Sequence, residues 1–281
     1  MKILITGGSG FLGRRAASHF SILDYQVLIP SHAELDITDQ DNVDRWFWQH
    51  RPKTVLHCAA VSDTGLCQRQ PEWSHRINVE GSVHLAKACA QTGTKLIFCS
   101  SDQVYHASTL PGPHSEGEAL IPETAYARQK LQAEQLIAAV CPDTVSLRLS
   151  WMYSTQFLSG EHGHLLTGLH DALHDETVPI IRSVHDFRGI TNADSVVRNL
   201  PAALNLPTGV YNFGAENDRD TYHTLQTVFK ELGLSKMLSR LAPDKTSPPR
   251  DIRMDGSQTS SHGITFESTV AGLFRALSNC I

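Results

Sequence analysis

The sequence predicts an α/β protein built on a doubly wound parallel sheet, with a small lobe toward the C-terminal end. Three observations lead to this expectation. Short apolar runs alternate with helical patterns over the first 150 residues, a glycine-rich turn directly follows the first run, and the alternation loosens after residue 150. Strands that alternate with helices form parallel sheets, because each crossover between parallel strands requires a helix-length connection.

The N-terminal turn is the motif around which the chain is organised. An apolar run, 3–5, precedes it, and a helical segment, 14–22, follows it. Strand, glycine-rich turn and helix form the layout that cradles a dinucleotide, with the pyrophosphate at the positive end of the helix. An ordinary strand-to-helix turn is the alternative, which the position directly after a strand disfavours. We therefore expect a cofactor to contact Gly7, Ser9, Gly10, Phe11, Leu12 and Gly13.

Each glycine of the motif has its own expected task. Gly7 lets the chain turn sharply out of the strand, and Gly10, without a Cβ, allows close approach of a pyrophosphate. Gly13 lets the new helix pack tightly on the sheet.

The remaining elements are expected from hydrophobic periodicity. Further strands are expected at 26–29, 54–57, 95–99, 145–149, 178–181 and 210–213, and further helices at 39–50, 73–91, 123–140, 192–204, 221–232 and 266–277. Asp39 is expected to cap one helix and Gly93 to end another. The segments 106–122 and 243–249 are expected to be loops. We expect a dinucleotide-binding domain over 1–150, to which 192–213 add, and a substrate-binding lobe formed mainly by 151–281.

Composition excludes several classes of protein. The 281 residues carry a net charge of -5 and are 41% hydrophobic, so no basic surface for nucleic acid is expected. No run of eighteen apolar residues is present and the N-terminal apolar run is short, so neither a membrane span nor a signal peptide is expected.

The cysteines and histidines predict no metal centre. The six cysteines form no Cys-x-x-Cys pair, which favours a reducing, cytoplasmic setting. His162-Gly-His164 has the spacing to hold a metal ion, but a solvated loop is the favoured interpretation.

Tyr126 and Lys130 are the first candidate catalytic pair. They lie four residues apart on an expected helix and therefore share one face. A nearby ammonium favours the phenolate, so the pKa of Tyr126 is expected below its usual ~10, which suits a general acid at neutral pH. A solvated helix face is the simpler alternative, because such a pair arises by chance in about one chain of six at this composition.

Ser101 follows the fourth expected strand, in the segment Cys99-Ser100-Ser101-Asp102. The carboxyl ends of strands in this fold face the ligand crevice. A hydroxyl there can donate a hydrogen bond to a carbonyl oxygen as negative charge develops on it. A Ser/Asp cap of the next loop is the alternative, and the combination with the glycine turn and Tyr126 favours catalysis.

Together these residues give the chain a resemblance to the extended short-chain dehydrogenase/reductases of the Rossmann type, and within them to the dTDP-4-dehydrorhamnose reductase group. The resemblance is carried by several motifs: Thr6 to Gly13, Leu35-Asp-Ile-Thr-Asp39, Arg51 to Ala60, Asn78-Val-Glu-Gly81, Ser100 to Tyr105, Tyr126 to Lys130, and Leu147 to Tyr153. Thinner matches occur at 187–191, 209–212 and 249–255.

The resemblance implies a catalytic trio of Ser101, Tyr126 and Lys130, in which Tyr126 gives a proton to the carbonyl oxygen as hydride arrives. It also implies that Lys130 binds the nicotinamide ribose and that Asp36 and Ile37 contact the adenine. Further cofactor contacts are expected from Cys58, Ala59, Ala60, Ser100, Leu149 and Ser150.

The expected cofactor is NADP(H), with NAD(H) left open. An acid at the end of the second strand would bind the ribose 2′-hydroxyl of NAD and repel a 2′-phosphate. Here the strand is followed by Pro30-Ser31-His32, with no acid before Glu34. Ser31, His32 and Arg14 are therefore the candidates to hold the phosphate.

The expected substrate is a small molecule, a nucleotide-activated sugar with a keto group. Its crevice is predicted to be lined by Ser62, Asp63, Tyr105, Trp151, Arg188 and Arg250. The arginines suit a pyrophosphate, and surface salt bridges are an equally favoured alternative for each.

Two other functions stay open at this point. The resemblance also includes nucleotide-sugar epimerases and dehydratases, and a regulatory subunit, the β-subunit of methionine adenosyltransferase. The intact trio favours an enzyme. No nucleic-acid or membrane partner is expected, and a homodimer is left open.

Overall fold

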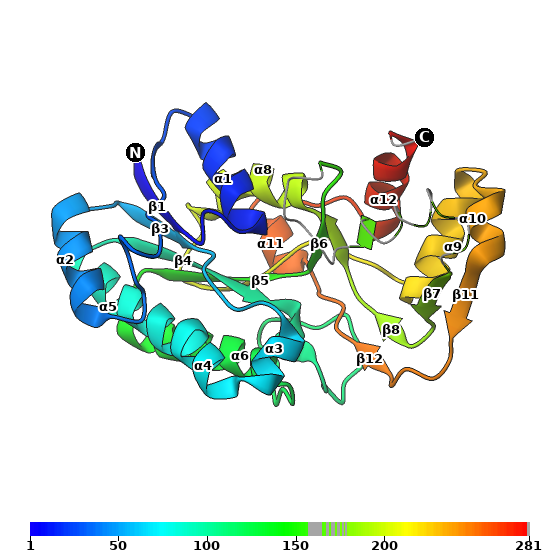
Figure 1. The fold of residues 1–281 in the computed structure, drawn as a ribbon, viewed down its shortest axis with the longest axis horizontal. Helices are drawn as coiled ribbons and strands as arrows, with labels where there is room; N and C mark the ends of the chain where they lie inside the picture. Colours follow the sequence, from blue (N-terminus) through cyan, green and yellow to red (C-terminus); the bar gives the residue numbers. More distant parts are fainter. Residues whose placement is uncertain are drawn as a thin grey trace. The chain divides into compact units, whose positions relative to one another are not determined.

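The structure is a computed structural model that describes residues 1–156, 165–166, 169, 172, 175, 177 and 179–279 (Figure 1). The expected histidine pair, His162 and His164, and the first residue of the strand expected at 178–181 lie outside the described residues.

A six-stranded sheet in the order β10-β5-β4-β3-β1-β2 forms the centre of the fold. Its strands are β1 (Lys2–Thr6), β2 (Gln26–Leu28), β3 (Thr54–His57), β4 (Lys95–Ser101), β5 (Thr144–Leu149) and β10 (Gly209–Phe213). The chain runs from β1 to β2 on one side and then returns to β3 on the other side of β1, with parallel pairing on both sides. The strand order therefore reverses between β1 and β3, the position where doubly wound sheets bind their ligands.

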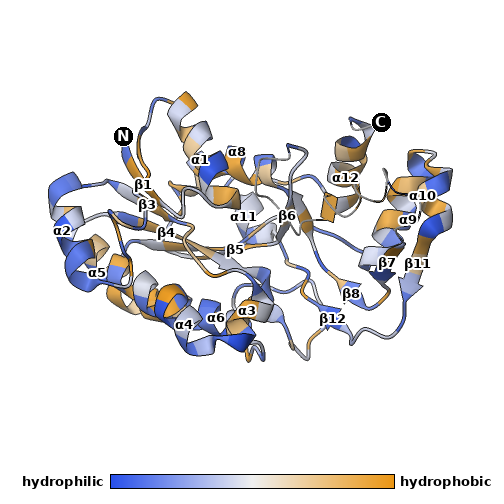
Figure 2. Cartoon of the chain, viewed as in Figure 1, coloured by the Kyte–Doolittle hydropathy of each residue, from blue (hydrophilic) through white to orange (hydrophobic). Residues whose placement is uncertain are grey.

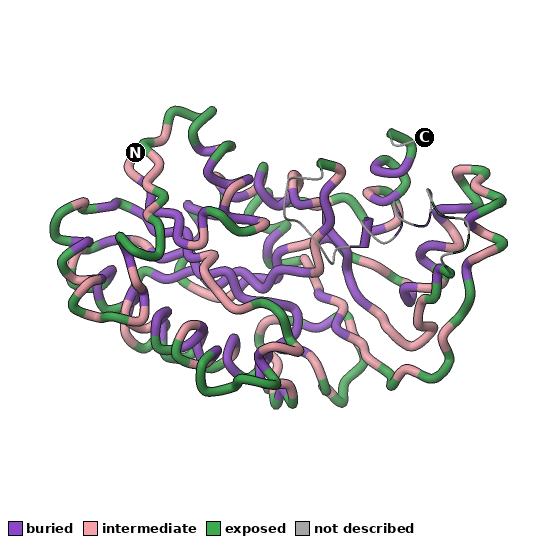
Figure 3. Tube along the Cα trace, viewed as in Figure 1, coloured by how far each residue is buried: buried purple, intermediate pink, exposed green. Residues whose placement is uncertain are grey.

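Apolar strands and amphipathic helices explain the core of this sheet. The strand residues Leu4, Val55 and Leu96 are fully buried. The central strands are drawn largely as buried in Figure 3, and hydrophobic stretches run along them in Figure 2. On one face they pack with α2 (Gln40–His50), α5 (Ser82–Thr92) and α6 (Ala125–Val140), while α1 (Phe11–Ile22) covers the other face (Figure 1). Both faces of the strands are therefore covered, as parallel sheets require.

The predicted helix ends are confirmed where a side chain or glycine sets them. The Asp39 carboxylate accepts a hydrogen bond from the Asn42 amide at the start of α2. Gly93 ends α5 in the left-handed conformation, with φ 62°. Thr124 caps α6 by accepting from the Ala127 amide, so this helix begins two residues later than expected.

The prediction of a single helix at 73–91 is wrong. The structure has α3 (Thr64–Arg69), α4 (Pro71–His75), a π-helical turn η1 (Arg76–Gly81) and then α5. Asp63 caps α3, and Pro71 starts α4 at a position where proline costs no hydrogen bond. The π-turn ends at Gly81, where a Cβ would lie 2.8 Å from the Ile37 side chain. Helical periodicity shows none of these breaks, because they depend on caps and on a distant contact.

Contacts divide the chain into two compact units. The first contains residues 1–106, 119–148 and 197–211, and the second contains 107–118, 149–196 and 212–281. The segment 107–118 thus groups with the later part of the chain, where His114 bonds to the backbone of Arg253, Asp251 and Asp255. The functional division into a cofactor domain and a substrate lobe stays a prediction.

The second unit has its own core around α9 (Thr221–Glu231) and α12 (Thr269–Ser278). Its described strands pair two by two: β6 (Trp151–Tyr153) with β9 (Ile190–Asn192), β7 (Ile180–Ser183) with β11 (Leu241–Asp244), and β8 (Asp186–Phe187) with β12 (Arg250–Asp251). This unit also contains α10 (Ser235–Arg240), α11 (Ser257–Ser261) and the first residues of α8 (Ala193–Ala203), whose remainder belongs to the first unit.

The loop expected at 243–249 begins too early, since Pro243 and Asp244 belong to β11. Proline is tolerated there because, among the residues that the structure describes, β11 pairs with β7 alone and is an edge strand. Within the described part of the chain, none of the helices has the length and hydropathy to cross a bilayer.

Candidate active site

The glycine turn between β1 and α1 has the geometry of a nucleotide cradle. Gly7 has φ 65°, and a Cβ there would come within 2.7 Å of the Ala59 amide nitrogen. A Cβ on Gly13 would lie 2.2 Å from the Gly7 carbonyl oxygen. Both positions therefore require glycine, one for the turn and one for the packing of α1 against it.

The same turn fits a bound pyrophosphate at Gly10. A Cβ there would have a single neighbour within 4 Å, the Gly7 carbonyl oxygen at 3.1 Å, so the fold itself leaves room on this side of Gly10. Helix α1 begins at the next residue without a side-chain cap and without an acidic residue in its first turn. Its N-terminus thus carries the positive end of the helix dipole toward this room, which suits an anion.

The residues after β2 are arranged differently from the expectation. The Glu34 carboxylate accepts hydrogen bonds from the Ser31 amide at 2.7 Å and from the Ser31 hydroxyl at 2.8 Å. These bonds lower the pKa of Glu34. His32 Nε2 lies 3.7 Å from the Asp36 carboxylate. Ser31 is thus already engaged by an acid, and the 2′-phosphate contact predicted for it requires Glu34 to move.

The end of β3 contains a buried histidine that the sequence analysis did not single out. His57 bonds to the Thr6 hydroxyl through Nδ1 at 2.7 Å and to the Ser82 hydroxyl through Nε2 at 2.9 Å. Burial lowers its pKa to about 3, helped by the Lys130 charge. A neutral imidazole therefore links β1, β3 and α5. It directly precedes in sequence the partly exposed Cys58, Ala59 and Ala60, the predicted cofactor contacts.

Ser101, Tyr126 and Lys130 are brought together at the end of β4. The Ser101 hydroxyl accepts from the Gln103 amide at 3.2 Å and donates to the Asp102 carboxylate at 3.2 Å, so it caps the turn that follows β4, as the alternative interpretation expected. It also lies near enough to the Tyr126 phenol to lower the pKa of that group. Lys130 Nζ donates to the Cys99 carbonyl oxygen at 2.8 Å and lies 5.8 Å from the centre of the Tyr126 ring. All three side chains are buried by the protein, at 8%, 8% and 3% exposure for Ser101, Tyr126 and Lys130. The alternative of a solvated helix face is therefore wrong.

The expected direction of the Tyr126 pKa shift is wrong. Burial raises the pKa of the phenol well above its ordinary value, the Ser101 hydroxyl opposes this, and the Asp102 charge adds to it. Burial also lowers the pKa of Lys130, against the effect of Cys99, Cys58 and Glu134. The lysine charge favours the phenolate and so lowers the pKa, but desolvation raises the pKa and dominates for a buried phenol. A protonated Tyr126 at neutral pH is the form that a proton donor requires.

A buried ion pair behind this group was also missed. Glu134 and Arg148 are each 4% exposed and joined by two hydrogen bonds, and the Ser100 hydroxyl donates to the same carboxylate. The Ser100 side chain thus points into the interior, away from the role of cofactor contact expected for it. The spacing of Glu134 four residues after Lys130 was the available signal.

Tyr105 does not support its prediction as a wall of the substrate crevice. Its side chain is fully buried, and its hydroxyl accepts a hydrogen bond from Arg148 at 2.9 Å. A ring that the protein encloses on all sides is part of the core. Ser62 is exposed, and the Asp63 carboxylate is used as the cap of α3, where it accepts from the Leu66 amide at 2.7 Å.

Several candidate residues belong to the second unit. The Arg188 guanidinium lies 5.0 Å from the centre of the Trp151 ring. Arg250 pairs with Asp186 at 2.8 Å, which is the salt-bridge alternative for that arginine. Leu149 ends β5, and the Ser150 hydroxyl bonds to the Thr191 hydroxyl, so Ser150 is buried inside this unit.

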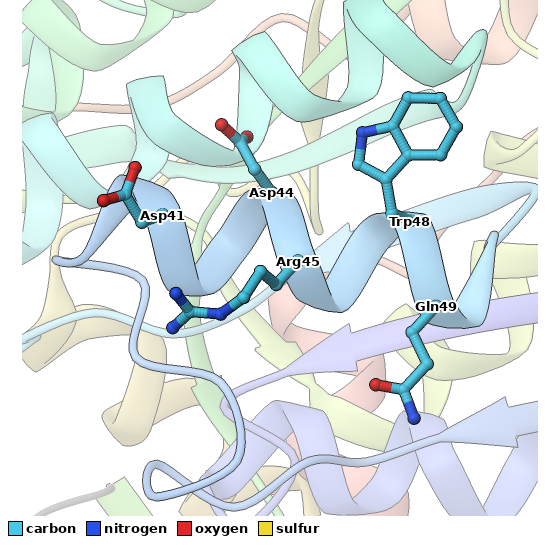
Figure 4. A pocket seen from close by; sticks show the side chains of 5 residues that line it. All are labelled: Asp41, Asp44, Arg45, Trp48 and Gln49. Carbon is cyan, nitrogen blue, oxygen red and sulfur yellow. The ribbon is translucent and has the colours of Figure 1, made fainter.

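A depression on the surface of α2 lies outside this site. It is lined by side chains of that helix alone: Asp41, Asp44, Arg45, Trp48 and Gln49 (Figure 4). None of them is a candidate residue, and among the described residues no group of three potential metal ligands is found.

Solved structures share this fold. A dTDP-4-dehydrorhamnose reductase from Bacillus anthracis str. Ames, in complex with NADP, superposes with a TM-score of 0.85 at 20% identity over 99% of both chains. Among curated sequences, a dTDP-4-dehydrorhamnose reductase from Mycolicibacterium smegmatis is 34% identical over 152 residues, 54% of this chain and 46% of that protein. The chain therefore spans about half the length of this relative.

A relative with a different printed role covers more of the sequence. The methionine adenosyltransferase 2 subunit beta of Danio rerio is 25% identical over 288 residues, 95% of this chain and 87% of that protein. The family model described as "RmlD substrate binding domain" matches residues 1–272, nearly the whole length. On this match, with the glycine cradle and the Ser-Tyr-Lys group in place, the chain belongs to the RmlD substrate binding domain family.

Proposed function

We propose that the protein is an NAD(P)H-dependent reductase of a keto group on a nucleotide-activated sugar, similar to dTDP-4-dehydrorhamnose reductase. The observation that carries this proposal is that Ser101, Tyr126 and Lys130 are buried together at the carboxyl end of β4, with Lys130 Nζ bonded to the Cys99 carbonyl oxygen and 5.8 Å from the centre of the Tyr126 ring. The names of the B. anthracis and M. smegmatis proteins support the same reaction and substrate class.

Each residue of the trio has a defined task in this reaction. The reduced cofactor, when bound, supplies a hydride to the carbonyl carbon. Tyr126 donates its proton to the carbonyl oxygen, and its raised pKa keeps that proton in place at neutral pH. Ser101 donates a second hydrogen bond to the same oxygen, where an interaction that strengthens with developing charge lowers the barrier. Lys130 holds a positive charge near the phenol and favours the tyrosinate that proton transfer leaves behind.

The cofactor is held, in this proposal, by the glycine turn and by the ends of β2 and β3. Gly10 and the N-terminus of α1 take the pyrophosphate, and the carboxylate of Asp36 and the side chain of Ile37 lie at the adenine. We propose NADP(H) as the cofactor, supported by the NADP complex of the B. anthracis protein.

The substrate contacts are proposed from the residues predicted to line the crevice. Trp151, Arg188 and Ser62 are its remaining candidates, with Arg188 for the pyrophosphate. We expect Arg188→Ala to weaken nucleotide-sugar binding while NADPH binding stays unchanged. A cytoplasmic location is also part of the proposal, since biosynthetic enzymes of nucleotide sugars use intracellular substrates.

Stopped-flow oxidation of NADPH against a panel of 4-keto nucleotide sugars tests the reaction. Tyr126→Phe keeps the ring and its packing but removes the donated proton, so turnover should fall by roughly 10²–10⁴ with NADPH affinity unchanged. Equal turnover of wild type and Tyr126→Phe on an accepted sugar would show that Tyr126 is not the acid.

A regulatory subunit is the second candidate function. It is favoured by one observation, the 87% coverage of the Danio rerio subunit beta, which exceeds the coverage of the M. smegmatis reductase. Tight NADPH binding by the wild type without reduction of any sugar in the panel would favour this function. Co-purification with a methionine adenosyltransferase catalytic subunit would then be the next measurement.

A further inference from the structure

Side chains on one face of α6 contact successive residues at the end of β4. Residues four apart along the helix each face a different residue of the strand end. Lys130 donates to the Cys99 carbonyl, Glu134 accepts from the Ser100 hydroxyl, and Tyr126 lies near enough to Ser101 for that hydroxyl to lower the pKa of the phenol. Two of these pairs belong to the candidate catalytic group, and the third, Ser100 with Glu134, has no part in the reaction as described above.

The third pair is the most firmly fixed of the three. Glu134 accepts from Arg148 Nε at 3.1 Å and from Arg148 Nη2 at 2.8 Å, and such a bidentate, charge-assisted pair is stronger and geometrically more specific than a single neutral hydrogen bond. Arg148 Nη1 also donates to the hydroxyl of Tyr105, which ends the 3-10 turn η2 (Asp102–Tyr105). One carboxylate on α6 thus connects β4, which ends at Ser101, with β5 and, through Arg148, with η2, which begins directly after Ser101.

We propose that Glu134 is a positioning residue that fixes Ser101 in register with Tyr126 and Lys130, acting through Ser100 and through Arg148 and Tyr105. The inference rests on the proposed reductase function, because its consequence is measured as turnover. The physical reason is that both anchored residues are connected to Ser101 through the backbone. Ser100 is bonded to Ser101 in the chain, and Tyr105 ends the turn that starts directly after it. A shift of Ser100 or of Tyr105 therefore changes the position of the Ser101 hydroxyl relative to the Tyr126 phenol. A displacement of about 1 Å in an active site can lower the reaction rate roughly 10²-fold.

Glu134 has a second effect on the same group through its charge. It lies four residues after Lys130 on α6, and its charge raises the pKa of Lys130 against the lowering caused by burial. Removal of this charge should make Lys130 lose its proton at lower pH. The alkaline limb of the pH–rate profile should then shift toward neutral pH, an effect that a merely structural residue does not produce.

Four variants separate positioning from stability. Ser100→Ala removes only the hydroxyl link and leaves the ion pair. Glu134→Gln removes the charge and leaves Arg148 buried without its counter-ion. The double variant Glu134→Gln/Arg148→Met removes both charges, which restores the balance that a buried ion pair requires. Glu80→Gln, on the same first unit but 52% exposed, is the matched control.

The measurements are melting temperature, kcat, KM for NADPH and the pH–rate profile. We expect kcat to fall roughly 10- to 100-fold in Ser100→Ala and Glu134→Gln, with KM for NADPH within about threefold of wild type. The double variant should regain most of the melting temperature without regaining kcat. Recovery of kcat together with stability would overturn the positioning role, since the ion pair would then serve the fold alone.

Amide hydrogen exchange provides a readout that needs no substrate. In Ser100→Ala, residues 99–105 should exchange faster than in wild type, while β1 and β3 stay protected. Unchanged exchange at 99–105 would overturn the inference whatever the substrate is. Failure of the wild type to reduce any nucleotide sugar would instead overturn the proposed function, and the exchange result would still decide whether Glu134 holds the strand end.

Discussion

Lys130 Nζ donates a hydrogen bond to the Cys99 carbonyl oxygen at 2.8 Å, so the candidate catalytic lysine is anchored to the strand that carries Ser101. The ammonium also lies 4.8 Å from the centre of the Phe98 ring. A buried cation is costly unless such partners compensate it. The position of Lys130 is therefore set by the end of β4, and its charge is available to the Tyr126 phenol.

The Lys130→Met variant tests this arrangement. It removes the charge that stabilises the tyrosinate and a predicted contact to the cofactor ribose. Turnover should fall by more than the roughly 10²–10⁴ expected for Tyr126→Phe, and NADPH affinity should fall as well. Steady-state kinetics and fluorescence titration measure the two effects, with the exposed Lys87→Met as the control. An unchanged NADPH affinity would remove the ribose contact from the proposal.

The glycine turn gives a prediction that separates folding from binding. Gly13→Ala places a Cβ 2.2 Å from the Gly7 carbonyl oxygen, so α1 must shift and stability should fall by about 1–3 kcal/mol. Gly10→Ala meets only one atom, at 3.1 Å, so the fold should tolerate it while a close pyrophosphate cannot. Thermal unfolding and NADPH titration of both variants provide the comparison. A Gly10→Ala protein that binds NADPH like wild type would place the pyrophosphate elsewhere.

Glu34 gives a prediction about cofactor choice. Its carboxylate is bonded to Ser31, the residue expected to receive a 2′-phosphate. Glu34→Gln keeps the side-chain length and removes the repulsion, so NADPH should bind roughly two- to fivefold tighter while NADH changes little, as for other exposed charges. The effect should weaken at high salt. Tighter binding of NADH than NADPH by the wild type would contradict the proposed preference for NADP(H).

His57 gives a prediction about acid stability. Its pKa is about 3 in the folded protein against 6.5 as the ordinary value, so the unfolded state binds the proton more readily between these pH values. Stability therefore falls as pH drops below 6.5, by roughly 2 kcal/mol at pH 5 from this residue alone. Denaturant unfolding at several pH values measures the slope. His57→Gln, which does not titrate, should show a smaller decline over the same range, and an identical decline would assign it to other groups.

The local elements of this protein were predictable from short-range patterns in the sequence. Short apolar runs between helical patterns predicted β1, β3, β4 and β5. Asp39 marks the start of α2 and Gly93 marks the end of α5, as predicted. The glycine turn and the four-residue spacing of Tyr126 and Lys130 indicated the cradle and the catalytic pair. These features were readable because each depends on residues within one or two turns of one another.

Features that depend on contacts between distant residues were not predictable from the sequence. Ser100 meets Glu134 across 34 positions and Tyr105 meets Arg148 across 43, so no local pattern shows that Tyr105 is core and that Ser100 faces inward. The raised pKa of Tyr126 likewise follows from burial, which the packing of α6 on β4 creates and a helical spacing cannot reveal. Desolvation and hydrogen-bond partners are properties of the folded surroundings, and for that reason the sequence named the reacting residues while the fold set their protonation and position.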